Sequence, residues 1–142
     1  LTREVVPYMK QQRWGRIIHL LPTRVNNPAE GAALSAASQM ALVGYSKMLA
    51  SELAPFNITV NNLLSGPVQT EFLTAALETR AEEQGRTLDD LTKDIVADIP
   101  MRRMGKPEEV GDLVAFLASD RSGYLTGTSV ILDGGAHQMA GS

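Results

Sequence analysis

The feature that most constrains this fold is a long helical pattern enclosed by two short apolar runs. Residues 32–53 contain no proline, are rich in Ala, Leu and Met, and end just before Pro55. The runs WGRIIHLL (residues 14–21) and NITVNNLL (residues 57–64) stand on either side, and the proline-containing segment 22–31 predicts a loop. Short apolar runs with β-branched residues are typical of buried parallel strands. The order strand, helix, strand therefore predicts two parallel strands joined by a crossover helix.

The remaining segments extend this alternation. Residues 2–12 predict a helix that Pro7 would kink, and residues 106–120 predict a helix with acidic residues in its first turn. The Glu-rich residues 72–98 are helical in pattern, and residues 124–135 predict a turn, a third strand and a Gly-rich stop. The sequence therefore predicts an α/β fold, with about three parallel strands and helices on both faces of the sheet.

Length, charge and composition limit the classes of partner. The 142 residues predict a single domain over residues 1–142. The net charge is −3 and no long run of Lys or Arg is present, which argues against a nucleic-acid partner. Cysteine is absent, which excludes disulfides and thiolate metal sites and fits a reducing cytoplasm, the expected location. We expect no membrane span, because no apolar run reaches about 18 residues. We also expect no metal site.

Three stretches of the chain resemble a known family in their order and spacing. They are GRII, then ELAPFNITVNNLLSGPVQTEF, then IPMRRMGKPEEVGDLVAFLASDRSGYLTGTSVILDGG. Together they resemble the C-terminal half of classical short-chain dehydrogenases/reductases, and within these the 3-oxoacyl-carrier-protein reductase type. The resemblance implies a Rossmann-type doubly wound sheet. It also implies NAD or NADP as the cofactor for an alcohol–carbonyl conversion.

The dinucleotide-binding half of that family has no counterpart in this sequence. No Gly-rich phosphate loop follows a predicted strand, and Gly134-Gly135 cannot open a helix over a pyrophosphate. The chain also begins inside a helical pattern and without Met. We therefore expect one domain that corresponds to the family's C-terminal half, with the N-terminal dinucleotide-binding half absent.

The catalytic residues of the family are a serine, a tyrosine and a lysine. The tyrosine phenol serves as general acid or base, and the lysine four residues later lowers its pKa from about 10. An ungapped comparison that starts from ITVN and SKMLASELAP places the tyrosine on Ser35, the lysine on Gln39 and the serine on Pro22. No Tyr in this chain is followed four residues later by Lys.

These three replacements cannot perform the same chemistry. A serine hydroxyl is a far weaker acid than a phenol, Gln39 carries no charge, and Pro22 offers neither a hydroxyl nor an N–H. Ser35 and Gln39 are then polar residues on a helix wall, with ligand binding through hydrogen bonds as the alternative. The sequence predicts that no member of the catalytic set is intact.

A few other residues are candidates for function. His19 lies near the end of a predicted strand and Thr23 follows Pro22, so either could serve in a new acid–base role. The resemblance implies that Gly66, Val68 and Thr70 face the nicotinamide carboxamide, although Ser65 replaces the proline that precedes this loop in the family. The alternative is that His19 is simply packed and that the loop is an inherited one without a ligand.

Three functions follow as hypotheses. In the first, the chain by itself is non-catalytic and acts as an oligomeric or interaction module, a dimer or tetramer, with no cofactor of its own. In the second, it is an NAD(P)-dependent oxidoreductase once an N-terminal half completes it. In the third, it co-assembles with an active family member. The small residues of 32–53 favour assembly, because they let a second helix approach closely.

Overall fold

The computed structural model describes residues 1–25 and 31–136. His137 and part of the predicted loop 22–31 lie outside the described residues. The elements follow one another as α1 (Thr2–Gln12), β1 (Gly15–Pro22), η1 (Thr23–Val25), α2 (Ala33–Leu53), η2 (Ala54–Phe56), β2 (Ile58–Ser65), α3 (Glu71–Gln84), α4 (Leu88–Ala97), α5 (Pro107–Ala118), η3 (Asp120–Ser122) and β3 (Ser129–Leu132).

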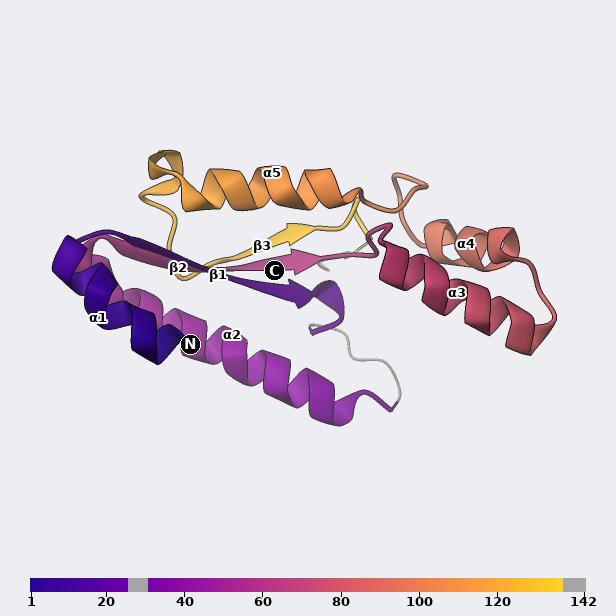
Figure 1. The fold of residues 1–142 in the computed structure, drawn as a ribbon, viewed down its shortest axis with the longest axis horizontal. Coiled ribbons are helices and arrows are strands. Elements are labelled where there is room, and N and C mark those ends of the chain that lie inside the picture. Colours follow the sequence, from indigo (N-terminus) through magenta and orange to yellow (C-terminus); the bar gives the residue numbers. More distant parts are fainter. Residues whose placement is uncertain (26–30, 137–142) are drawn as a thin grey trace.

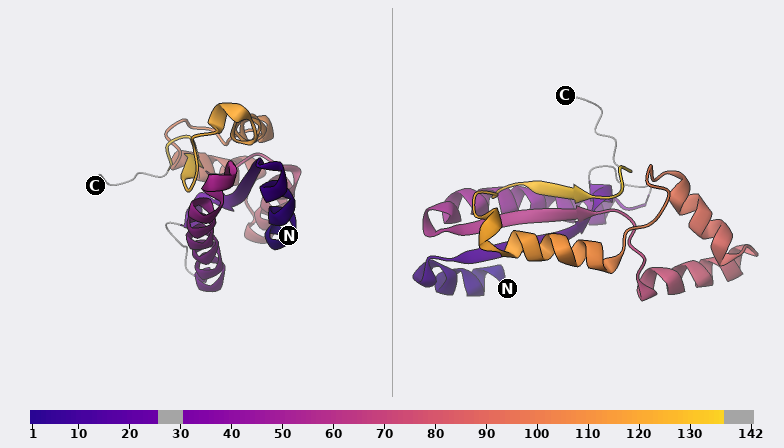
Figure 2. Two further views of the ribbon diagram at one scale, coloured as in Figure 1. Left: turned by 90° about the vertical axis from the view of Figure 1, so that its left-hand side faces the viewer. Right: turned by 90° about the horizontal axis from the view of Figure 1, so that it is seen from above.

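The three strands form one parallel sheet in the order β1-β2-β3. Helices α1 and α2 cover one face of the sheet and α5 covers the other, whereas α3 and α4 extend beyond the carboxyl ends of the strands (Figures 1 and 2). The predicted α/β fold is thus confirmed. The strand ends are aligned, since Pro22 pairs with Ser65 and Ser65 with Leu132. Loops that follow the strands therefore meet at one edge, where ligand sites of such sheets are found.

Helix α2 has one continuous side that packs on the sheet towards its C-terminal end and is exposed at Ser35. Its residues there are spaced by four and three positions in turn, which keeps them on one side of a helix: Ser35, Gln39, Leu42, Ser46, Leu49 and Leu53. Towards the C-terminal end of α2 this face is buried, and Leu53, 1% exposed, packs with Ile17, Ile58 and Val60. Apolar side chains buried between helix and sheet supply the main driving force for this packing.

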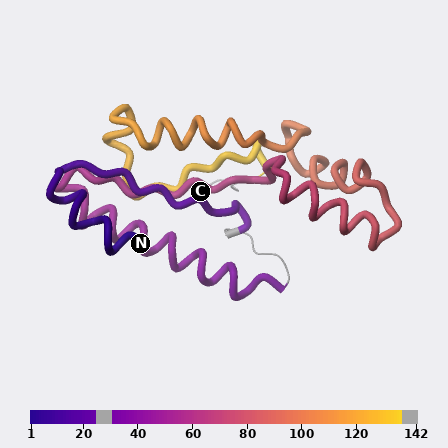
Figure 3. Tube along the Cα trace, viewed as in Figure 1, coloured from indigo at the N-terminus to yellow at the C-terminus, as the bar shows by residue number. Residues whose placement is uncertain are grey.

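Three details differ from the sequence expectations or refine them. Pro22 is the last residue of β1, although it was expected in the loop; an edge strand tolerates proline because one side of its backbone needs no partner. Helix α1 runs unbroken through Pro7. The Glu-rich stretch divides into α3 and α4 at Gly85, whose φ of 61° lets the chain turn back (Figure 3).

No helix among residues 1–25 and 31–136 combines the length and the apolar character that a membrane crossing requires. In the same residues, no group of three or more His, Asp or Glu side chains is placed to hold a metal ion.

Candidate functional site

Two of the three predicted catalytic positions lie together. Ser35 and Gln39 occupy successive turns at the start of α2, and Gln39 Nε2 donates a hydrogen bond to Ser35 Oγ at 3.1 Å. Ser35 is exposed and Gln39 is half-buried. Pro22 ends β1 and is exposed, and the turn η1 that follows it packs against α2. Pro22, Ser35 and Gln39 thus lie on the same side of the molecule, where β1 ends and α2 begins.

The paired side chains at Ser35 and Gln39 can bind by hydrogen bonding but cannot transfer a proton near neutral pH. The Gln39 amide carries no charge that would lower the pKa of a neighbouring hydroxyl. Ser38 Oγ donates to the Ser35 carbonyl at 2.8 Å, so this hydroxyl is used locally within the helix. The arrangement therefore supplies neither a general acid nor a general base.

His19 belongs to a polar chain whose two middle residues are buried. Its Nδ1 lies 2.8 Å from Ser46 Oγ, and Ser46 Oγ also lies 2.8 Å from Asn62 Oδ1. Asn62 Nδ2 in turn donates to Ser129 Oγ at 3.2 Å, so the chain crosses all three strands beneath α2. Ser46 is fully buried and Asn62 is 2% exposed. This chain satisfies polar groups inside the core, and among the described residues no hydrogen bond links His19 to Thr23, Ser35 or Gln39.

The predicted nicotinamide contacts lie on the loop after β2. Gly66 N–H donates to the Leu132 carbonyl at 2.9 Å and so extends the pairing of β2 with β3. A Cβ on Gly66 would lie 2.9 Å from the Asp133 Cα, which requires a glycine there. Thr70 Oγ1 accepts from Leu73 N–H at 3.1 Å and caps α3. Within residues 1–25 and 31–136 the Thr70 hydroxyl hydrogen has no acceptor and can be donated to a ligand, whereas the Gly66 amide hydrogen is used within the sheet.

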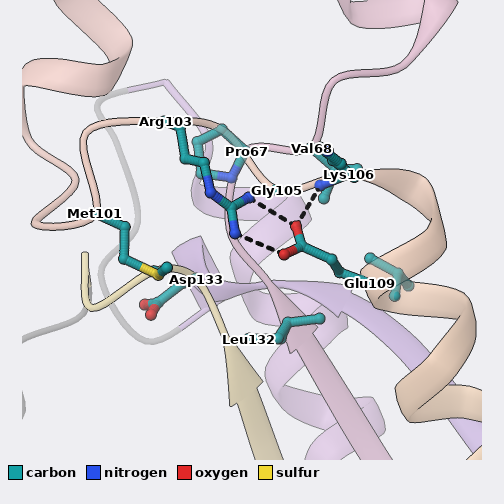
Figure 4. Close-up of a pocket in the computed structure, with 11 residues that line it drawn as sticks. Pro67, Val68, Met101, Arg103, Gly105, Lys106, Glu109, Leu132 and Asp133 are labelled. Carbon is teal, nitrogen blue, oxygen red and sulfur yellow. Dashed lines mark hydrogen bonds and ion pairs between the residues drawn. The ribbon is translucent and has the colours of Figure 1, made fainter.

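Val68 belongs to a second strand-like contact, with Gly105. Gly105 N–H donates to the Pro67 carbonyl at 3.0 Å, and Gln69 N–H donates to the Gly105 carbonyl at 2.9 Å. The loop is thereby attached to the segment before α5. The small cavity beside it, about 60 Å³, is far below the roughly 300–1,000 Å³ of drug-sized ligand sites (Figure 4).

An ion pair lies in the wall of this cavity. Arg103 Nη1 and Nη2 lie 2.8 Å and 2.6 Å from the two carboxylate oxygens of Glu109, and Lys106 N–H donates to Glu109 Oε2 at 2.7 Å (Figure 4). The hydrogen bonds from Arg103 and then from the Lys106 backbone lower the pKa of Glu109 from 4.5 to about 2. A bidentate Arg–carboxylate pair restricts the orientation of both side chains. Here it holds the segment before α5 against the first turn of that helix.

The pH dependence of stability should report this pair. Because the folded-state pKa of Glu109 is lowered, its contribution to stability is present above pH 4.5 and is lost as the pH falls towards 2. We expect the melting temperatures of the wild type and of Glu109→Gln to converge between about pH 5 and pH 2.5. Thermal unfolding by circular dichroism measures this, and Glu108→Gln controls for the loss of an acidic charge in the same turn. A difference in melting temperature between the two proteins that stays constant over this pH range would contradict the assigned ion pair.

By themselves, the residues beside the predicted nicotinamide contacts do not form a complete site for a dinucleotide cofactor. A hollow of about 420 Å³ adjoins Thr70, and its charged side chains are Glu71 and Glu78. It has no cationic side chain, so it would repel a pyrophosphate. The hollow beside Thr70 thus offers a hydroxyl for a carboxamide contact and no cationic side chain for a phosphate.

Sequence reasoning missed the Ser46–Asn62 hydrogen bond and the Arg103–Glu109 pair. Asn61 and Asn62 inside an otherwise apolar strand were the available signal, because a buried amide needs partners. Glu109 was visible as an acidic residue in the first turn of a helix, but its partner Arg103 lies in a loop whose path only the structure shows.

Comparisons with known proteins agree with this architecture. Residues 1–137 match the family model described as Enoyl-(Acyl carrier protein) reductase. The chain is 38% identical over 136 residues to Dehydrogenase/reductase SDR family member 4 of Oryctolagus cuniculus, covering 96% of this chain and 49% of that protein. It is 35% identical to Acetoacetyl-CoA reductase of Allochromatium vinosum, covering 95% and 50% respectively.

A solved structure shows the same fold. The crystal structure of YwfH, an NADPH dependent reductase involved in bacilysin biosynthesis, superposes with a TM-score of 0.88 at 32% identity. The match covers 96% of this chain and 52% of YwfH. The chain spans about half the length of the curated relatives it matches. It belongs to the short-chain dehydrogenase/reductase family and corresponds to the C-terminal half of a member of that family.

Proposed function

We propose that this chain by itself does not catalyse the oxidation or reduction typical of its family, and that it acts as an oligomeric interaction module. The observation that carries the proposal is the Gln39–Ser35 hydrogen bond in the first turns of α2. By the ungapped comparison, these two residues occupy the lysine and tyrosine positions, and Pro22 occupies the serine position. A neutral amide paired with an alkyl hydroxyl supplies no proton donor of suitable pKa.

An exposed apolar stripe on α2 supports assembly. On the side away from the sheet, helical spacing aligns Leu34, Ala37, Ala41, Tyr45 and Met48, and all five are exposed. Leu34 is 86% exposed and Met48 is 50% exposed. A contiguous apolar stripe on a helix without a partner favours contact with another chain, and the alanines allow a close approach. A second copy of this chain would pair the same stripe with itself about a twofold axis.

Assembly is tested by sedimentation velocity of the purified chain. We expect a dimer or a larger oligomer at micromolar concentration. The double variant Ala37→Glu, Met48→Glu should sediment as a monomer, because it places two charges in the apolar contact. Ala115→Glu, at an exposed position of α5 on the other face of the sheet, should leave the oligomer intact. A wild type that stays monomeric at about 100 μM would contradict the proposed module.

The second candidate is an NAD(P)-dependent oxidoreductase completed by an N-terminal half. Its support is the outer edge of β1, which has no strand partner among the described residues. Leu20, near the end of that strand, is 58% exposed. Parallel sheets are normally covered on both faces and paired at their strands, so this edge suits a further strand and a further covering helix. The double length of the relatives points the same way.

A further inference from the structure

A groove between α3, α4 and the segment before α5 has no role in the function proposed above. It measures about 440 Å³, within the roughly 300–1,000 Å³ typical of small-molecule sites. Pro22, Ser35 and Gln39 do not line it. Its apolar lining comes from both helices and from the following segment: Leu73, Leu77, Leu88, Val96 and Met104.

The polar part of the groove is strongly cationic. Its lining contains Lys93, Arg102, Arg103 and Lys106 but only one acidic side chain, Asp89. This excess of positive charge stands out in a chain whose net charge is −3. A cleft with one sign of charge beside apolar walls concentrates ligands of the opposite charge.

Two of these cations have no carboxylate partner. Lys93 Nζ pairs with Asp89 at 2.5 Å, and Arg103 pairs with Glu109. The Arg102 guanidinium donates to the Ala97 carbonyl, which leaves its charge uncompensated. Among the described residues, neither Arg102 nor Lys106 takes part in an ion pair. A guanidinium and an ammonium at one groove can therefore bind an added carboxylate without first breaking a salt bridge.

We propose that this groove binds an anionic amphiphile of the fatty-carboxylate class. Its apolar chain would lie between α3 and α4 against Leu73 and Met104, and its carboxylate would contact Arg102 and Lys106. Binding removes the apolar chain from water, and the two cations set the orientation. The site is separate from the vacated catalytic positions, so it stands whether or not the chain is an enzyme.

The test is a titration of the full chain with decanoate below its micelle concentration, followed by methyl NMR. We expect saturable shifts of the Met104 and Leu73 methyl groups. Decanoate should bind at least about tenfold more tightly than decanol or decyltrimethylammonium, which share its chain but not its charge. Thr92→Phe, which fills the groove from α4, should abolish the shifts for all three probes.

Charge variants separate recognition from simple apolar binding. Arg102→Gln with Lys106→Gln should weaken decanoate binding at least about tenfold and leave decanol unchanged. Because Arg102 has a φ of 54° and its replacement can disturb the loop, Lys106→Gln alone is the second variant, with an expected loss of about threefold. Arg3→Gln with Arg121→Gln removes two exposed cations outside the groove and should change nothing. Equal binding of the three probes, shifts confined to other residues, or no saturable binding of decanoate would overturn the proposal.

Discussion

Replacing Pro22 with Ser, Ser35 with Tyr and Gln39 with Lys is expected to create NADPH-dependent reduction of acetoacetyl-CoA in a fusion that supplies the first half of a homologous reductase. The unrestored fusion should show only background turnover. General acid–base catalysis by a positioned side chain contributes about 10²–10⁴ in rate, so the restored fusion should be at least about 100-fold faster. The lysine introduced at position 39 lies one helical turn from the tyrosine introduced at position 35 and would lower the pKa of its phenol.

A matched control isolates the phenol. Ser35→Phe, combined with Pro22→Ser and Gln39→Lys, supplies the same ring without the hydroxyl and should remain at background. Turnover by the unrestored fusion would show that the replaced positions are not required. Equal inactivity of the tyrosine and phenylalanine variants, with cofactor bound in both, would contradict the placement of the catalytic positions on Ser35 and Gln39.

Leu53→Ala is expected to lower the free energy of unfolding by about 2–5 kcal/mol. Leu53 is 1% exposed and lies where α2 meets both β1 and β2, in contact with Ile17 and Val60. Truncation removes buried apolar area and leaves a cavity that a helix packed on a sheet cannot easily close. Urea denaturation followed by far-UV circular dichroism measures the loss.

Leu34→Ala is the matched control for that measurement. It is the same substitution in the same helix, but Leu34 is 86% exposed, so we expect a change below about 0.5 kcal/mol at concentrations where the chain is monomeric. If the two variants lost equal stability, α2 would not pack on the sheet through its Leu53 face.

The β1-α2-β2 unit could be predicted from the sequence, because its strand and helix segments differ in length and in the spacing of their apolar residues. The apolar runs around Ile17 and Val60 are too short for helices, and the long segment between them has the three-and-four spacing of a helix. Gly85 and Pro107 marked the boundaries of α3, α4 and α5 for local backbone reasons. Such signals act over a few residues and are readable without tertiary structure.

The groove and the polar chain could not be predicted in this way. The groove forms because the segment between α4 and α5, which contains Arg102 and Lys106, lies beside α3 and α4. No local sequence pattern predicts that this segment lies beside those helices. The contact of His19 with Ser46 joins a strand to a helix 27 positions later. The loss of the catalytic set could be proposed from the sequence alone. It depends on one missing phenol and one missing ammonium group, and not on the surrounding fold.

The most direct test of the central claim is a fluorescence titration of the unmodified chain with NADH and NADPH. The claim is that this chain by itself has no cofactor-dependent chemistry, and the hollow beside Thr70 has no cationic side chain to hold the pyrophosphate of a dinucleotide. We expect no saturable change in nicotinamide emission, or in that of the partly exposed Trp14, up to about 1 mM cofactor. Saturable binding at micromolar concentration would contradict the claim and would favour the oxidoreductase.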